Sequence, residues 1–242
     1  MTLTSAELDD VARQYYLTDP HADMWIEELE GELGLERVAE AIAGCERVLE
    51  LGYGTGMTTR ALRGRGIAIE VVEGSPVLVE TARAAHPGLV VHEAMFETFA
   101  PGPAFDAVLA LFVAEHVDDP VALFRTAAQW LRPGGRLVVA VPNAGSIHRR
   151  LAVRMGLQER LDSFSGRDVL LGHQRVYELA RLRADAEAAG LRVTGQFGWF
   201  LKTVPFSMML DYPRELVAAL DAISPDLPDE LLANIAVVAE RI

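Results

Sequence analysis

The chain has 242 residues, 50% of them hydrophobic, and a formal net charge of −13 at pH 7. This length and composition suit one domain with a sizeable core. The acidic balance argues against nucleic-acid backbones and anionic membranes as partners, because both reward clustered cations. Cys45 is the single cysteine, which excludes an internal disulfide and a cysteine-rich metal site.

The N-terminal residues show neither a basic region nor an apolar signal core. No window reaches the roughly 18 uninterrupted apolar residues of a membrane span. We therefore expect a soluble, cytoplasmic protein that forms a single domain over residues 1–242. The sequence leaves the oligomeric state open and is compatible with a homodimer.

The first 45 residues predict a helical cap that precedes the first strand. Thr4 and Glu7 form a capping-box pattern at the start of a helix. A second helix is expected over 23–33 and a third over 36–43. These helices lie outside the β-α-β pattern that begins after them.

Strands and helices alternate over roughly the next hundred residues. The hydrophobic pattern predicts strands at 47–51, 67–72, 89–93, 105–111 and 136–141, with helices at 57–63, 76–85 and 120–131. Such alternation is typical of an α/β fold, a parallel sheet with helices on both faces. Ligands of such folds bind beyond the carboxyl ends of the strands.

Residues 143–177 depart from this alternation. The segment carries paired charges and scattered apolar residues, and it is too long for an ordinary loop in a compact domain. We expect a helical insertion that covers the active site. A helix at 179–189 and a strand at 191–197 follow, and the tail predicts a helix at 213–223 and a strand at 235–241.

The segment Val-Leu-Glu-Leu-Gly-Tyr-Gly-Thr-Gly at 48–56 joins the first strand of the alternation to its helix. Glycines at alternate positions permit a tight turn and let a ligand approach the backbone closely. Their G-x-G-x-G spacing differs from the G-x-G-x-x-G that places a pyrophosphate on a helix N-terminus. Glu50, just before the glycines, disfavours a phosphate and favours a ligand that carries a cation.

Glu73 ends the second predicted strand and precedes Gly74 and Ser75. In α/β nucleotide sites, an acidic residue about 20 residues past the glycines accepts hydrogen bonds from ribose hydroxyls. Glu73 stands at that place. The alternative is a solvated strand end.

Four segments, in this order, resemble class I S-adenosylmethionine-dependent methyltransferases: E-L-G-Y-G-T-G, V-V-E-G-S-P, F-D-A-V-L-A-L-F-V-A-E-H-V-D-D-P and L-R-P-G-G-R-L-V-V-A-V-P-N. They cover residues 48–143, and the chain up to residue 195 also resembles a bacterial small-molecule methyltransferase subgroup. The resemblance implies a Rossmann-like, seven-stranded, mostly parallel sheet with helices on both faces. It implies that the strands at 191–197 and 235–241 form an antiparallel pair, and that the methyl donor is S-adenosyl-L-methionine, with S-adenosyl-L-homocysteine as product.

The resemblance also implies which residues contact the donor. Glu50 and the glycine loop would hold its amino-acid part, and Glu73 its ribose. Many relatives have an aspartate for the adenine amino group where this chain has Ala94 and Met95, so we expect apolar packing on the adenine instead, with plain core packing as the alternative. The expected donor contacts are Tyr16, Glu50, Gly52, Tyr53, Gly54, Thr55, Gly56, Glu73, Gly74, Ser75, Met95, Phe96, Leu111, Phe112 and His116.

Methyl transfer from a sulfonium needs alignment and exclusion of water. The histidines lack the spacing of a zinc site, so we expect a metal-free mechanism. His116 and His173 are the candidate catalytic bases. The alternative for His116 is a role in ordering its loop, and the alternative for His173 is a salt bridge within the insertion. The residues expected to contact the acceptor are Tyr15, Trp25, Asn143, His148, Arg149, His173, Arg175 and Tyr177.

Two arginines of the insertion and four residues of the N-terminal helices are further candidates for binding roles. Arg149 and Arg175 suit either an acidic group of the substrate or salt bridges within the insertion. Tyr15, Tyr16, His21 and Trp25 are candidates for a lid over the donor, with core packing as the alternative for Trp25.

For the acceptor we expect a small molecule, methylated on a hydroxyl or carboxyl oxygen first and on nitrogen second. Methylation of a peptide or protein terminus is a further alternative, because the fold permits many functions. A protein that binds the donor without transferring its methyl group is the alternative outside the enzymes.

Overall fold

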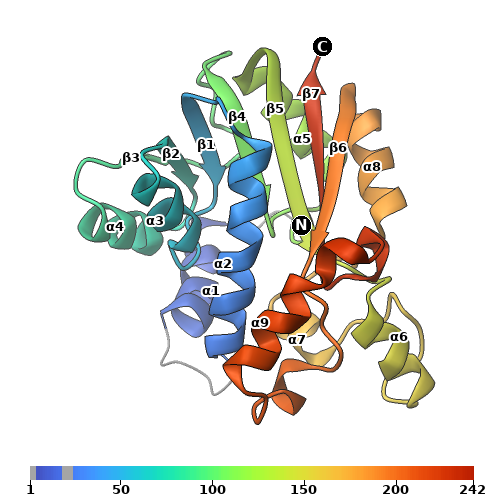
Figure 1. Ribbon diagram of the computed structural model, residues 1–242. Coiled ribbons are helices and arrows are strands. Elements are labelled where there is room, and N and C mark those ends of the chain that lie inside the picture. Colours follow the sequence, from blue (N-terminus) through green and yellow to red (C-terminus); the bar gives the residue numbers. More distant parts are fainter. Residues whose placement is uncertain (1–3, 18–23) are drawn as a thin grey trace.

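One twisted sheet organises the protein, whose computed structural model describes residues 4–17 and 24–242 (Figure 1). Its seven strands follow the order β3-β2-β1-β4-β5-β7-β6. The strands are β1 (Arg47–Leu51), β2 (Ala68–Glu73), β3 (Val90–Glu93), β4 (Phe105–Leu111), β5 (Leu131–Pro142), β6 (Leu191–Trp199) and β7 (Asn234–Arg241). Strands β1 to β5 are parallel, and β7 runs antiparallel to both β5 and β6. The predicted fold class is confirmed.

Helices cover both faces of the sheet (Figure 1). The face that β1 shows through Val48 carries α2 (Met24–Ala41) and α3 (Met57–Gly64), and α4 (Pro76–Ala85) packs on the same face at β2. The opposite face, shown through Leu49, carries α5 (Pro120–Trp130) and α8 (Leu179–Ala188). Alternate residues of β1 therefore enter two separate cores, as the two-residue period of a strand requires.

A cap of short helices lies at the carboxyl ends of the parallel strands, at the bottom of Figure 1. It comprises α1 (Ser5–Val11), the π-helix η1 (Ala12–Tyr16), α6 (Ile147–Arg154), α7 (Gly166–Leu170), η2 (Phe206–Met208), α9 (Arg214–Ala222), η3 (Ser224–Asp226) and η4 (Asp229–Leu231). The capping box of Thr4 and Glu7 begins α1 as predicted. The segment 143–177 contributes α6 and α7. Within the described ranges, no helix combines the length and apolar character that a bilayer crossing requires.

The helices predicted at 23–33 and 36–43 form one continuous helix, α2, so that prediction is wrong. Gly34 lies inside this helix and does not interrupt it. A Cβ at Gly34 would lie 2.5 Å from Cε2 of Trp199, because the indole packs directly on the helix backbone. The glycine therefore serves a close contact between α2 and β6, which the local pattern does not reveal.

Strand β5 begins at Leu131, earlier than the predicted residue 136. Leu131 pairs with Phe105 across an irregularity in the β4–β5 register. The proline and glycines that follow Leu131 indicate a turn from sequence, and the backbone does depart from the ladder there: the pairing goes from Leu131 directly to Arg136, and Gly134 has a φ of 76°. The position of β5 in the sheet and its parallel direction relative to β4 are unaffected.

Replacement of Gly34 by alanine tests the contact between α2 and Trp199. Gly34→Ala should lower the free energy of unfolding by about 1–3 kcal/mol, because overpacking forces the helix and the indole apart. Gly64→Ala, near the end of α3, is the matched control, since a Cβ there meets no atom within 4 Å. Urea unfolding of both variants gives the comparison, and equal stabilities would contradict the packing.

Candidate active site

The glycine loop after β1 has a backbone that suits only glycine. Gly52, Gly54 and Gly56 have φ values of 78°, 54° and 73°, in the left-handed region. A Cβ at Gly56 would also collide with the hydroxyl of Tyr53. Gly56 caps the N-terminus of α3, so the loop presents bare backbone and the first N–H groups of a helix to a ligand.

Tyr53 and Thr55 lie between these glycines. The side chain of Tyr53 is buried below the loop and packs edge-to-face on the His86 ring, with centroids 6.1 Å apart. Its backbone N–H, and not its ring, faces the strand ends. The expected contact of Tyr53 with a donor therefore reduces to its backbone.

Glu50 points from β1 toward α3 and is 5% exposed. Its Oε2 accepts a hydrogen bond from the hydroxyl of Thr59, a buried residue that the sequence analysis missed. Burial raises the pKa of Glu50 to about 8. The ion pairs of the described residues do not include Glu50. Glu50 therefore offers a buried negative charge that a cationic ligand would stabilise.

Glu73 ends β2, next to β1, and its carboxylate is held by two backbone groups. The N–H of Tyr53 donates to Oε2 at 2.8 Å and the N–H of Ser75 donates to Oε1 at 2.7 Å. Burial raises its pKa. Each carboxylate oxygen keeps a second lone pair, so Glu73 can accept hydroxyl groups in a fixed orientation.

The N-terminal helices close over these strand ends. The carboxylate of Asp9, missed by the sequence analysis, accepts hydrogen bonds from the Ser75 hydroxyl and from the N–H of Val77 at 3.1 Å. The Tyr16 ring lies over Gly54, where a Cβ would be 3.7 Å away. The expected lid residue His21 lies outside the described residues.

Apolar side chains lie around the same strand ends. The sulfur of Met95 and a methyl group of Leu8 both crowd Gly74, and Phe96 packs at the margin of the main core. Phe112, directly after Leu111 at the end of β4, has a φ of 56°. This strained backbone places its ring edge-to-face on Trp199, with centroids 6.0 Å apart.

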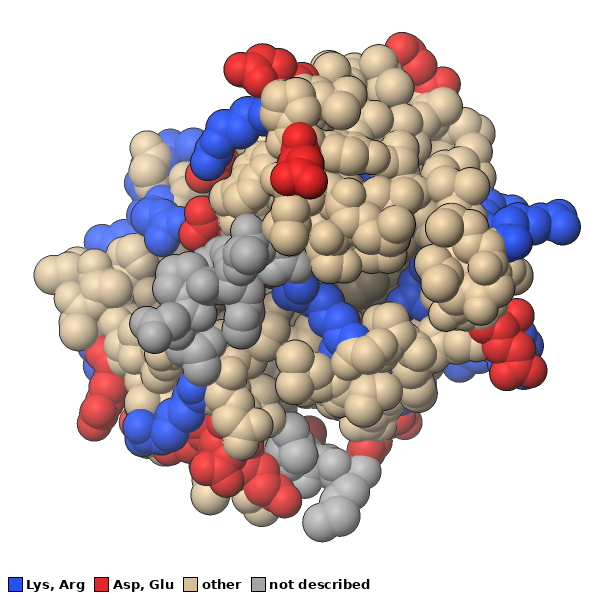
Figure 2. Space-filling model, turned by 90° about the horizontal axis from the view of Figure 1, so that it is seen from below, with Lys and Arg blue, Asp and Glu red and all other residues tan. Residues whose placement is uncertain are grey.

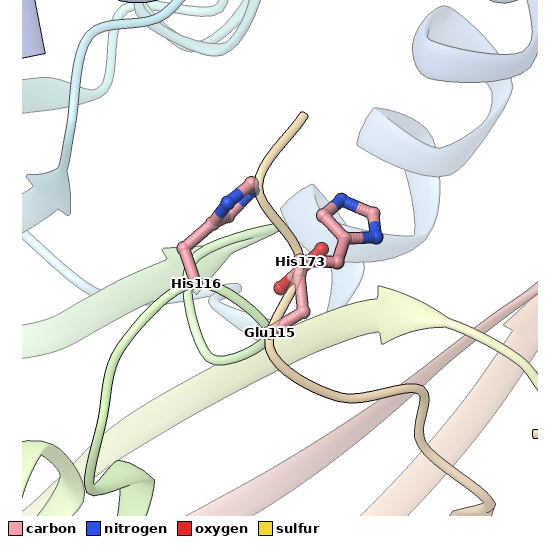
Figure 3. A group of neighbouring side chains, drawn as sticks. All are labelled: Glu115, His116 and His173. Atoms are coloured by element: carbon pink, nitrogen blue, oxygen red, sulfur yellow. The ribbon is translucent and has the colours of Figure 1, made fainter. Parts of the chain in front are cut away.

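Glu115, His116 and His173 form a compact polar cluster beyond β4 (Figure 3). Their ligand atoms all lie within 4.8 Å of one another. Glu115 is 1% exposed, and among the described residues neither of its carboxylate oxygens has a hydrogen-bond partner. Burial raises the pKa of Glu115 to about 8, and burial together with His173 lowers the pKa of His116 to about 4. His116 is therefore neutral near pH 7.

His173 is oriented by Asp168, a further residue that the sequence analysis missed. Nδ1 of His173 lies 2.8 Å from one oxygen of Asp168, and Arg149 donates to the other at 2.7 Å. Ser165 adds its backbone N–H at 2.7 Å, within a capping box that the Ser-Gly-Arg-Asp sequence could have suggested. With Nδ1 bonded to a carboxylate, Nε2 is the lone-pair nitrogen of neutral His173.

Arg175 fastens the end of the insertion to the loop after β4. Its guanidinium donates to the carbonyls of Ala114, Val117 and Asp118. The N–H of Gln174 donates to the Glu115 carbonyl at 2.8 Å. These bonds bring His173 against His116 and support the structural alternative for Arg175.

Other residues expected at the acceptor also make internal contacts. Asn143 donates to the carbonyls of Glu230 and Leu232. The Tyr177 hydroxyl donates to Asp185. Arg149 donates to the carbonyls of Leu161 and Ser163. Tyr15 accepts a hydrogen bond from Arg167, and Arg214 lies over the Trp25 ring. His148 differs, because its buried Nδ1 has no partner in the described part of the chain.

Seen from below, the end of the molecule that carries the cap is hollowed near its centre (Figure 2). Basic side chains border the hollow, while acidic side chains lie mostly toward the periphery. This distribution on the surface of the cap contrasts with the net charge of −13.

Comparison with known proteins agrees with this geometry. The family model described as "Methyltransferase domain" matches residues 13–196. A ubiquinone biosynthesis O-methyltransferase from Xylella fastidiosa is 36% identical over 115 residues, which are 45% of this chain and 45% of that protein. The chain thus matches less than half the length of this curated relative.

Two solved structures share the fold over nearly the whole chain. A possible histamine N-methyltransferase from Thermotoga maritima has a TM-score of 0.63 at 17% identity and covers 98% of this chain and 97% of its own. The cyclase SpnF has a TM-score of 0.60 at 18% identity and covers 100% and 97%. At these identities the likeness shows the fold alone.

The strand order and the glycine loop define the class I S-adenosylmethionine-dependent methyltransferase fold. With the family model matching most of its length, the chain belongs to the methyltransferase-domain family. S-adenosyl-L-methionine is the cofactor that this family and fold imply.

The unpartnered Glu115 predicts an unusual dependence of stability on pH. Its folded-state pKa of about 8 exceeds the ordinary value of 4.5, so between these values the folded state holds a proton that the unfolded state releases. Stability therefore falls as pH rises through this window. Glu115→Gln, which stays neutral, should gain stability over the wild type by more than about 1 kcal/mol at pH 8, and by less at pH 5.

Urea unfolding of both proteins from pH 5 to pH 8 in chelator-containing buffer checks this expectation. A difference between variant and wild type that does not change with pH would show that Glu115 is ionised in the folded protein.

Proposed function

We propose that this chain binds S-adenosylmethionine across the carboxyl ends of β1 and β2 and transfers its methyl group to an oxygen of a small molecule. The observation that carries this proposal is the pair of buried carboxylates, Glu50 and Glu73, beside a loop whose glycines all have positive φ. The bound donor supplies a methyl group already activated by a sulfonium.

The residues present suit the donor. Glu50, buried without a basic partner, would accept hydrogen bonds from the donor's ammonium group, and the charge would lower its pKa again. Glu73, fixed by two backbone N–H groups, would accept the ribose hydroxyls. Met95 and Phe96 would pack on the adenine, and Tyr16 would cover the loop from the cap.

The acceptor would lie between the strand ends and the insertion. Phe112 and Trp199 provide an apolar wall, while His116 and His173 provide the polar end where a nucleophilic oxygen would be deprotonated and aligned. His148, with its unpartnered nitrogen, would contact the same molecule. Alignment and exclusion of water are what such a chamber contributes to the reaction.

Oxygen is preferred over nitrogen as the accepting atom because the curated relative is named an O-methyltransferase. The neighbour named as a possible histamine N-methyltransferase keeps methylation of an amine as the second candidate. The cap, held shut by Asp9 and Ser75, favours a small molecule over a peptide or protein terminus.

Proton release on donor binding tests the role of Glu50. Below pH 8 the free protein carries Glu50 protonated, and a bound cation favours the carboxylate, so binding should release close to one proton at pH 6.5 and fewer at pH 9. Calorimetry in buffers of different ionisation enthalpy counts this proton. Glu50→Gln should abolish the release and weaken donor binding by about 1–3 kcal/mol.

Thr58→Ala, which leaves the Glu50 carboxyl in place, is a neighbouring control that should keep most of the release. Absence of S-adenosylmethionine binding at micromolar concentrations would overturn the proposed function. A Glu50→Gln variant that binds and releases protons like the wild type would overturn the assignment of Glu50.

Turnover with matched acceptors tests the accepting atom. We expect transfer of the methyl group to phenols or carboxylic acids, with slower transfer to the corresponding amines, when each is incubated with the donor and followed by mass spectrometry. Preferential methylation of the amines would replace the oxygen acceptor with the second candidate.

A further inference from the structure

We infer that Glu115, His116 and His173 form a binding site for a divalent transition-metal ion. The cluster offers one carboxylate oxygen and two imidazole nitrogens, a set of two histidines and one carboxylate. Such a set holds a metal on one side and leaves further coordination positions open for substrate or water.

The geometry of the cluster suits one ion. The three ligand atoms lie within 4.8 Å of one another, and the two imidazole rings are 4.7 Å apart at their centroids (Figure 3). With metal–ligand bonds of about 2.0–2.2 Å, ligand atoms lie at most about 4.4 Å apart. Small side-chain rotations would therefore bring all three atoms to a shared ion.

Glu115 supplies an independent indication of a ligand. It is 1% exposed, yet both carboxylate oxygens are without a partner among the described residues. A buried polar group without a partner is destabilising, and a buried charge more so. An ion bound between Glu115 and the histidines would provide the missing partner.

The surroundings of His173 are those of a metal-binding histidine. Asp168 accepts from Nδ1, which fixes the tautomer and directs the lone pair to Nε2. Arg149 and Ser165 in turn hold Asp168. Histidine ligands commonly have such a carboxylate on the nitrogen that does not bind the metal.

The nitrogen donors indicate the kind of ion. Imidazole suits zinc, iron, cobalt, nickel and copper, whereas magnesium and calcium prefer oxygen ligands. The spacing of histidines in the sequence gave no sign of this site, because residues 115–116 and 173 meet only through the fold.

The ion would have a role at the acceptor, and this role rests on the proposed function. An acceptor hydroxyl bound to the ion would lose its proton to water, because coordination lowers its pKa. The resulting oxygen anion would form a bond to the methyl carbon as the S–CH₃ bond breaks. The electron pair of that bond goes to sulfur, which leaves S-adenosylhomocysteine, and neither histidine needs to take the proton.

Calorimetric titration of the chelator-treated full chain with Zn²⁺, Mn²⁺ or Mg²⁺ tests the site. We expect one Zn²⁺ per chain, and binding of Mg²⁺ at least tenfold weaker. Glu115→Gln and His173→Ala should each weaken Zn²⁺ binding at least tenfold. Asp168→Asn, which keeps all three ligands, should weaken it by about 10–100-fold.

His92→Ala is the matched control, because His92 is not part of this cluster. Its Nε2 lies 2.8 Å from Oε2 of Glu70. It should leave Zn²⁺ binding unchanged, and circular dichroism confirms that each variant is folded. Co²⁺ bound to the wild type should give visible absorption bands that Glu115→Gln lacks.

The inference is overturned if folded wild-type protein binds no Zn²⁺ below about 100 μM, or if His92→Ala loses binding as Glu115→Gln does. Donor binding by the metal-free wild type is measured on the same sample. Donor binding without Zn²⁺ binding would remove the metal site alone, and Zn²⁺ binding without donor binding would remove the proposed function alone.

Discussion

Three buried carboxyl groups lie at one edge of the sheet, and the rest of the candidate site is arranged around them. Glu50 and Glu73 lie at the ends of the neighbouring strands β1 and β2, and Glu115 follows β4 on the other side of β1. Burial raises the pKa of each. Parallel strands bring their carboxyl ends to the same edge, so the chain concentrates potential negative charge there at a cost in stability. Cationic ligands would offset that cost.

Two other carboxylates, Asp9 and Asp168, accept several hydrogen bonds each and position parts of the molecule. Asp9 receives hydrogen bonds from the start of α4, and Asp168 from Arg149, Ser165 and His173. Hydrogen bonds lower the pKa of both. These ionised groups hold the cap and the insertion in place, whereas Glu50, Glu73 and Glu115, whose pKa values burial raises, border the space that a ligand would occupy. The direction of the pKa shift thus separates these positioning residues from the candidate binding residues.

Much of the fold follows from local pattern. Strands β1 and β4 and helix α4 have the bounds that hydrophobic alternation predicts, because each is flanked by clear caps or glycines. The continuity of α2 could not be predicted, since it depends on the contact of Gly34 with Trp199, which lies far away in sequence. Propensity marks a glycine as a break, and only tertiary packing shows otherwise.

The candidate site also has one part that the sequence predicts and another that only the fold brings together. Glu50, Glu73 and the glycine loop belong to one β-α-β unit, so their spacing in sequence fixes their spacing in the fold. The cluster of Glu115 and His173 is different, because it depends on where the insertion returns to the sheet. Arg149 and Arg175 resemble substrate-binding residues in sequence, but in the structure they donate to Asp168 and to backbone carbonyls.

A crystal structure with S-adenosylhomocysteine bound tests most directly whether the buried carboxyls with raised pKa values are the binding groups. We expect the ribose hydroxyls on Glu73, the amino group on Glu50, and the sulfur directed toward Glu115, His116 and His173. A nucleoside bound away from β1 and β2, or a sulfur facing away from that cluster, would contradict it.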